Sequence, residues 1–165
     1  MKKEKQKWLI VANWKMNPTT SKLAKQTFSS IKKIANKMRK VDTVICPPYI
    51  YIENLKTTGH RLTLGSQDIF AEPEGSFTGC VSYLQLKNLG IKYTLVGHSE
   101  RRKMGETDEN VNSKIKASLR AIITPIICIG EEKRDEAGQY LKFLKDQLVD
   151  SLQGLPKTSI KDIVV

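Results

Sequence analysis

The sequence is poor in the residues that mark secreted, metal-binding or membrane proteins. Its 165 residues include only three cysteines, Cys46, Cys80 and Cys128, an odd number at wide spacing. This argues against a disulfide framework or a zinc site and fits a reducing cytoplasm. No apolar run approaches the roughly 18 residues that span a bilayer, and the apolar stretch after the charged residues 1–7 is too short for a signal peptide. We therefore expect a cytoplasmic protein that binds no membrane.

Acidic residues are also scarce, because 28 lysines and arginines outnumber 17 aspartates and glutamates and give a net charge of +11. Nucleic acid binding would explain this balance. However, the lysines are spread along the chain, with no RNP-like, zinc-finger or arginine-rich motif. We therefore favour solvated helix faces and expect no nucleic acid partner. A positive field would also attract an anionic substrate.

What the sequence does contain is a regular alternation of short apolar runs and amphipathic segments. The apolar runs predict buried strands, at 8–12, 42–46, 61–65, 93–96 and 125–129, with a sixth beginning at 160–165. Helical spacing and capping residues predict helices between them, at about 21–38, 49–56, 82–89, 108–122 and 137–152. A repeat of about 30 residues indicates parallel strands joined by right-handed crossovers.

The length of this repeat indicates the fold. A closed barrel of eight βα units uses about 250 residues, which is also about 30 per unit. The sequence therefore predicts an α/β fold in which residues 1–165 form a single domain, an incomplete (β/α)8 barrel of about five units. The alternative is an open doubly wound sheet, but no Gly-x-Gly-x-x-Gly follows the first strand. Because 160–165 is a hydrophobic strand rather than a tail, we expect a fragment of a longer chain.

Polar residues follow two of the predicted strands at their carboxyl ends, where parallel α/β proteins carry out their chemistry. Asn13 and Lys15 follow the first strand, on the same side of an extended chain, and Gly97–Arg102 follows the fourth. A lysine can hold a phosphate or a developing oxyanion, and a neutral imidazole at His98 can polarise a carbonyl. Together they suit proton abstraction beside the carbonyl of a small phosphorylated substrate.

Both segments also have a simpler interpretation. Asn13–Lys15 is typical of a turn with an exposed lysine. Gly97–Arg102 is typical of a helix start, with Ser99 as the N-cap, Glu100 in the first turn and the arginines solvated. The long polar loop at 67–80 favours a functional site, because loops of this length inside a compact domain are usually functional.

Four ordered motifs resemble the triosephosphate isomerase family, namely Val11–Asn17, Gly75–Gly79, Val96–Arg102 and Thr124–Glu131. The resemblance implies a TIM barrel that interconverts glyceraldehyde 3-phosphate and dihydroxyacetone phosphate by proton transfer through an enediol or enediolate. It also implies a homodimer, with no cofactor and no metal.

The resemblance assigns roles to four residues at the strand ends. Asn13 and Lys15 would bind the substrate. His98 would be the electrophile that shuttles protons between the two substrate oxygens. Glu100 would lie near Lys15 and His98, with a supporting or proton-handling role.

Three further residues would support this site. Ser99 would help to assemble it, and Cys128 would pack beside it rather than act as a nucleophile. Thr78, at the tip of the long loop, would reach into the partner subunit of a homodimer and steady that subunit's substrate-binding residues.

The sequence also departs from the family's pattern. The family's glutamate base, on an Ala-Tyr-Glu-Pro motif after strand six, is not among the 165 residues, nor are its lid and two later phosphate-binding loops. Cys80 stands where the family often has a glutamate that braces the dimer, and Ile122 where it usually has glycine. We therefore expect the isolated chain to be inactive. The alternative is a non-catalytic basic partial-barrel module that binds anions or nucleic acid.

Overall fold

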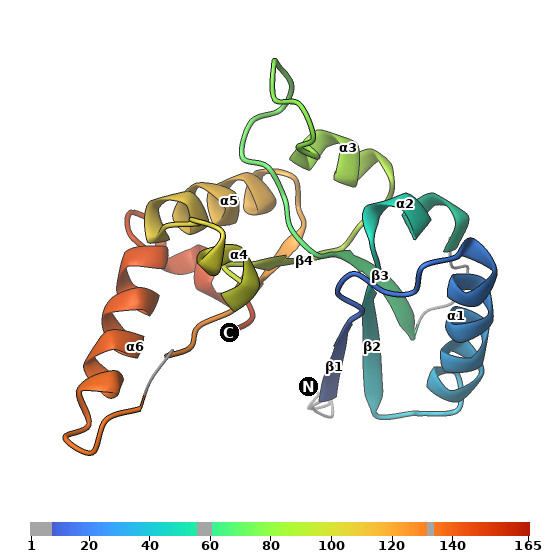
Figure 1. Ribbon diagram of the computed structural model, residues 1–165, viewed down its shortest axis with the longest axis horizontal. Helices are drawn as coiled ribbons and strands as arrows, with labels where there is room; N and C mark the ends of the chain where they lie inside the picture. Colours follow the sequence, from blue (N-terminus) through green and yellow to red (C-terminus); the bar gives the residue numbers. More distant parts are fainter. Residues whose placement is uncertain (1–7, 56–60, 132–133) are drawn as a thin grey trace, which may run out of the picture.

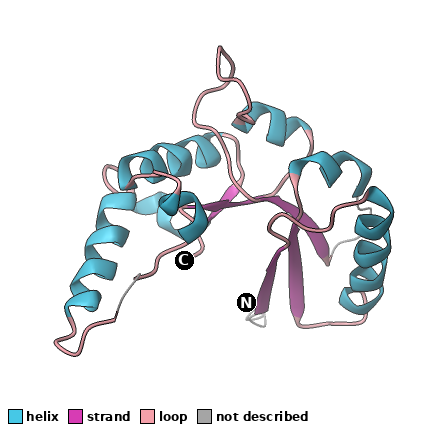
Figure 2. Ribbon diagram, in the orientation of Figure 1, coloured by secondary structure: helices cyan, strands magenta, loops and turns pink. Residues whose placement is uncertain are grey.

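The structure is a computed structural model that describes residues 8–55, 61–131 and 134–165. Its strands form one parallel sheet in sequence order, made of β1 (Trp8–Asn13), β2 (Val41–Cys46), β3 (Leu62–Ser66), β4 (Tyr93–Val96) and β5 (Thr124–Ile127). The sheet is strongly curved, with helices along its outer side and an open concave side (Figures 1 and 2). This curled half-barrel confirms the predicted truncated (β/α)8 barrel.

The described residues contain six α-helices, of which four begin at a side-chain cap. The six helices are α1 (Ser21–Ala35), α2 (Tyr49–Ile52), α3 (Tyr83–Asn88), α4 (Ser99–Lys103), α5 (Asp108–Arg120) and α6 (Gln139–Ser151), with 3-10 turns η1 (Glu53–Leu55) and η2 (Lys157–Asp162). Thr20 caps α1. Ser82 and Gln85 form a capping box at α3, as Thr107 and Asn110 do at α5. These hydrogen bonds satisfy backbone amides that have no partner within the first turn of a helix, so they fix the residue at which each capped helix begins.

Burial alternates along the strands and separates two apolar layers. Ile45 of β2 belongs to the large cluster between sheet and helices, which also contains Ile115 of α5. Its neighbours Val44 and Cys46 point to the opposite face of the sheet. They pack with Leu95 in a smaller apolar cluster on the concave side. Period-two alternation of this kind places adjacent side chains on opposite faces of a sheet.

Two helices expose large apolar residues to solvent. In α1, Ala24 and Phe28 are buried, whereas Leu23 and Ile34 are 49% and 62% exposed. Phe28 has the largest apolar side chain of this helix, so its burial determines which side faces the sheet. Leu141 of α6 is also exposed, because this helix packs mainly against α5 and is covered on one side. None of the described helices is long and apolar enough to cross a bilayer.

The predicted sixth strand is wrong over its first residues. Lys157–Asp162 forms η2, which follows Pro156 at a φ of −60°, the value to which the proline ring restricts the chain. Parallel pairing begins only at Val164, which bridges to Ile126. The Val164 amide donates to Pro125 O and its carbonyl accepts from the Ile127 amide. The end of the described chain therefore lies beside β5.

Ile122, which follows the C-cap residue Ala121 of α5, has a φ of 60° and a side chain that is 82% exposed. The position therefore requires the left-handed conformation that is associated with glycine at helix ends. An L-residue there costs about 1–2 kcal/mol, and β-branched residues fit it worst.

We expect Ile122→Gly to raise the free energy of unfolding of the full-length protein by about 1 kcal/mol, because strain relief exceeds the added chain entropy of glycine. Urea unfolding measures this change. Ile122→Ala keeps the Cβ atom and serves as the control, with a smaller gain expected. A lower free energy of unfolding for Ile122→Gly than for the wild type would contradict this account.

Candidate active site

The chain leaves β1 through a turn formed by Asn13 and Lys15. The Lys15 amide donates to Asn13 Oδ1 over 2.9 Å, and Lys15 itself has a φ of 54°. Strained backbone of this kind persists only where the surrounding structure holds it. The turn places the Lys15 ammonium at the carboxyl end of the sheet, with a half-exposed side chain.

Gln67, directly after β3, holds this turn in place. Its Nε2 donates to Lys15 O over 2.7 Å and to Cys46 O over 3.0 Å. The Trp14 amide also donates to Cys46 O. One side-chain amide therefore joins the carboxyl ends of β1, β2 and β3. The sequence analysis did not identify Gln67 as a site residue. The only sequence feature that could have indicated it is its position at the start of the polar loop after the third strand.

We expect Gln67→Leu to lower the kcat/KM of the full-length protein by about 10–100-fold for the isomerase reaction that the resemblance implies. The reason is that a displacement of a catalytic group by about 1 Å can cost this much. Steady-state kinetics measures the change. Gln85→Leu, which removes another hydrogen-bonding amide at the α3 capping box, is the matched control and should keep kcat/KM. Equal kinetics for Gln67→Leu and the wild type would refute the positioning role of Gln67.

His98 forms the N-cap of α4, so the prediction of Ser99 at this position is wrong. The His98 Nδ1 accepts a hydrogen bond from the Glu100 amide over 3.2 Å. An accepting ring nitrogen carries no proton, so the neutral imidazole has its proton on Nε2. Ser99 is then the first residue of the helix and is exposed.

The turn from β4 into His98 is anchored by Gly97 and Arg102. Gly97 has a φ of 73°, and a Cβ there would lie 3.0 Å from side-chain atoms of Val111 and Arg102, so any other residue would be strained at this position. Arg102 Nε donates to Gly97 O over 2.9 Å, and its Nη1 pairs with Asp108 over 2.6 Å. The expectation of solvated arginines is therefore wrong for Arg102.

Glu100 joins the two sides of the site. Its Oε1 lies 2.8 Å from Lys15 Nζ, and its Oε2 lies 3.7 Å from His98 Nδ1. The hydrogen bond from Lys15 lowers the pKa of the Glu100 carboxyl below its ordinary value. The side chains after β1 and β4 thus meet at one ionised carboxylate. We call Lys15, His98 and Glu100 the strand-end cluster.

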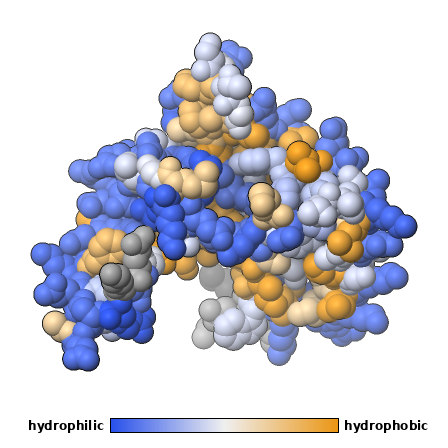
Figure 3. Space-filling model, in the orientation of Figure 1, coloured by the Kyte–Doolittle hydropathy of each residue, from blue (hydrophilic) through white to orange (hydrophobic). Residues whose placement is uncertain are grey.

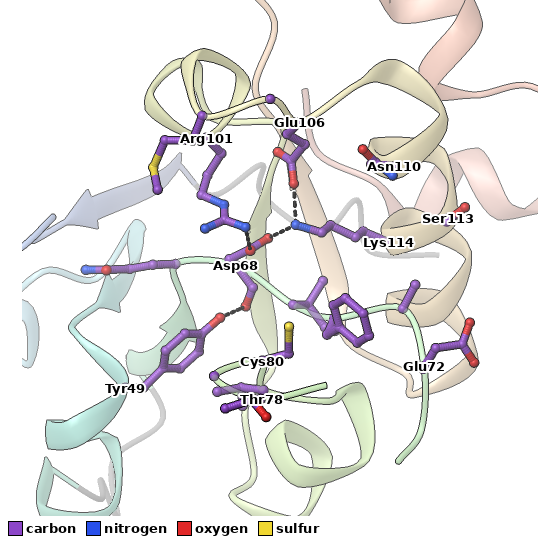
Figure 4. A pocket seen from close by; sticks show the side chains of 18 residues that line it. Tyr49, Asp68, Glu72, Thr78, Cys80, Arg101, Glu106, Asn110, Ser113 and Lys114 are labelled. Atoms are coloured by element: carbon purple, nitrogen blue, oxygen red, sulfur yellow. Dashed lines mark hydrogen bonds and ion pairs between the residues drawn. The ribbon is translucent and has the colours of Figure 1, made fainter. Parts of the chain in front are cut away.

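Cys128 and Thr78 lie outside this cluster. Burial raises the pKa of the Cys128 thiol, which packs against the smaller apolar cluster and is placed to donate weakly to Ile126 O over 3.9 Å. A raised pKa disfavours the thiolate that a nucleophile needs. Thr78 is exposed and lines a pocket of about 750 Å³ beside the loop after β3 (Figure 4).

The loop that carries Thr78 projects from the rest of the molecule (Figure 1). The rings of Phe70 and Phe77 pack with centroids 4.7 Å apart. Phe77 is nevertheless 44% exposed, and white and orange atoms gather on this projection (Figure 3). The loop is therefore stiffened from within but keeps an uncovered apolar side.

Among the residues that the structure describes, no group of three or more histidines, cysteines, aspartates or glutamates is placed to hold a metal ion. The groups available at the strand ends are an ammonium, an imidazole, a carboxylate and an amide. They can bind an anion and exchange protons with it.

Comparison with known proteins matches residues 8–165 to a family described as triosephosphate isomerase. Relatives named triosephosphate isomerase from Alkaliphilus oremlandii and Alkaliphilus metalliredigens are 35% and 39% identical over 163 aligned positions, which cover 95% of this chain and 64% of each relative. A relative of the same name from Dehalococcoides mccartyi is 41% identical over 151 positions, covering 89% of this chain and 59% of the relative. The chain therefore spans less than two thirds of the length of these relatives.

Proposed function

The chain belongs to the triosephosphate isomerase family, and on this premise we propose that the full-length protein interconverts glyceraldehyde 3-phosphate and dihydroxyacetone phosphate. Proton transfer would proceed through an enediol or enediolate. The observation that carries the proposal is the strand-end cluster, in which Glu100 brings Lys15 and His98 to one site.

Each group of this site has a property that suits the reaction. The Lys15 ammonium would hold the anionic substrate and stabilise the developing oxyanion. The His98 Nε2–H would donate to the substrate carbonyl, because Nδ1 is occupied by the Glu100 amide. The Asn13 side-chain oxygen accepts from the Lys15 amide, which leaves its NH2 group to donate to a substrate oxygen.

Glu100 is a poor candidate for the base that removes the carbon-bound proton. Its carboxylate is paired with Lys15, and this interaction lowers its pKa. A base is most effective when its pKa lies near the working pH. We therefore assign Glu100 a supporting role and propose that the base of the full-length protein comes from outside the described residues, as the resemblance implies.

The test is an isomerase assay of the full-length protein, in which dihydroxyacetone phosphate formed from glyceraldehyde 3-phosphate is reduced by an added dehydrogenase with NADH. We expect saturable turnover. A folded full-length protein without turnover that shifts nucleic acid in a gel would instead support the basic binding module.

We also propose a homodimer in which the loop around Thr78 docks on the partner. Its support is the family and the uncovered apolar side of the projecting loop, where Phe77 is 44% exposed. Light scattering of the full-length protein is expected to give twice the mass of one chain at micromolar concentration. A fully active monomer would contradict the proposal.

A further inference from the structure

A second group of charged side chains, separate from the strand-end cluster, lines the pocket in Figure 4. Lys114 of α5 is only 6% exposed. Its ammonium contacts Asp68 Oδ1 over 2.6 Å and also Glu106 Oε1. Arg101 pairs with the other Asp68 oxygen over 3.0 Å. These four residues, which we call the Lys114 cluster, carry two positive and two negative charges.

The charges of this cluster depend on one another. A buried ammonium or carboxylate is tolerated only when it is paired and hydrogen-bonded. Within the described part of the chain, Glu106 Oε2 is buried without a hydrogen-bond partner, so the Glu106 carboxylate relies on its contact with Lys114. A buried ion pair is often no more stable than apolar residues of similar volume. Stability alone therefore does not explain why charges are placed here.

The members of the cluster come from the segments that hold the two sides of the candidate active site. Asp68 is the neighbour of Gln67, whose amide donates to the carbonyl of Lys15. Arg101 and Glu106 belong to α4 and the turn after it, the segment that begins at His98. The Lys114 ammonium therefore fastens the loop after β3 to the loop after β4.

We propose that Lys114 is a positioning residue that sets the separation between Lys15 and His98, by fixing the loop after β3 against α4. The inference rests on the proposed isomerase function, because that reaction needs both groups on one substrate. Lys114 acts through Asp68 and Glu106 and does not itself contact the substrate.

The test is the double variant Lys114→Met/Glu106→Gln in the full-length protein. It removes one charge of each sign and leaves the ion pair between Arg101 and Asp68, so no uncompensated charge is buried. We expect kcat to fall about 10–100-fold, because a misplacement of about 1 Å is enough for this. KM should change by less than about threefold, because the Lys15 ammonium remains available for ground-state binding.

Asp68→Asn should also lower kcat. It removes the carboxylate that pairs with Lys114 and changes the shape of the side chain very little. Lys116→Met, on the same helix but outside the Lys114 cluster, is the matched control and should keep the wild-type kcat. A crystal structure of the double variant should show α4 displaced from the Lys15 turn by about 1 Å.

The outcomes separate this inference from the proposed function. A wild-type protein without isomerase turnover overturns the proposed function, while the displacement of α4 still tests Lys114. If the wild type is active and either the double variant or Asp68→Asn keeps the wild-type kcat, the positioning role of Lys114 is refuted. It is likewise refuted if α4 and the Lys15 turn superimpose on the wild type in the double variant.

Discussion

His98→Gln is expected to lower kcat of the full-length protein by about 10²–10⁴-fold, the range that a general acid–base group contributes. The glutamine side chain can still accept a hydrogen bond from the Glu100 amide, as His98 Nδ1 does over 3.2 Å, so the start of α4 should persist. It can also donate to a substrate oxygen. It cannot, however, exchange a proton between two oxygens, because an amide does not ionise at neutral pH.

Steady-state kinetics in both directions measures this loss. His60→Gln is the chemically matched control, since His60 is the other histidine of the sequence and belongs to none of the four motifs that resemble the family. We expect it to leave kcat unchanged. A His98→Gln protein with the wild-type kcat and an unaltered thermal unfolding midpoint would remove His98 from the reaction.

The strand ends could be predicted from the sequence because their signals are local. A buried parallel strand is a continuous apolar run, and Asn13, Lys15 and His98 are the first polar groups after two such runs. Once the strands are parallel, the carboxyl ends lie on one side of the sheet. The convergence of Lys15 and His98 on Glu100 thus follows from topology, whereas their catalytic roles stay predictions.

Other features depend on contacts between distant segments and leave no local signal. Gln67 bonds to carbonyls that lie 52 and 21 residues away, and Lys114 pairs with Asp68 over 46 residues. A glutamine at the start of a loop and a lysine inside an amphipathic helix are ordinarily solvated. Only the curvature of the sheet, which brings the loop after β3 beside α4 and α5, makes them partners.

The choice of cap at α4 was missed for a different reason. Serine is one of the preferred N-cap residues and histidine is not, so Ser99 was the better candidate on propensity alone. His98 follows Gly97, whose φ is positive, and it occupies the N-cap position instead, with its Nδ1 accepting from the Glu100 amide. The space beside Gly97 is narrow, since an added Cβ would lie 3.0 Å from Val111, so tertiary packing restricts this turn in a way that local preference does not show.

The isolated 165 residues are expected to show at least about 10⁴-fold lower kcat/KM than the full-length protein, the upper end of what a general base contributes. Glu100 after β4 and Glu131 after β5 are both engaged. Glu100 is paired with Lys15, and Glu131 with Arg134 over 2.6 Å. Their pKa values are lowered, mainly by the Lys15 hydrogen bond for Glu100 and by a backbone amide for Glu131. Neither is therefore a ready base.

The open barrel adds a second reason for this loss. β1 is an edge strand whose Trp8 and Ile10 side chains are 76% and 46% exposed, and such edges favour association with other chains. The purified 165-residue chain should therefore aggregate, as light scattering would show, and should give no turnover in the coupled assay. Turnover near the full-length rate would contradict this prediction and make one of the two carboxylates the base. Glu100→Gln and Glu131→Gln in the isolated chain would then identify it, because only the variant that lacks the base would lose activity.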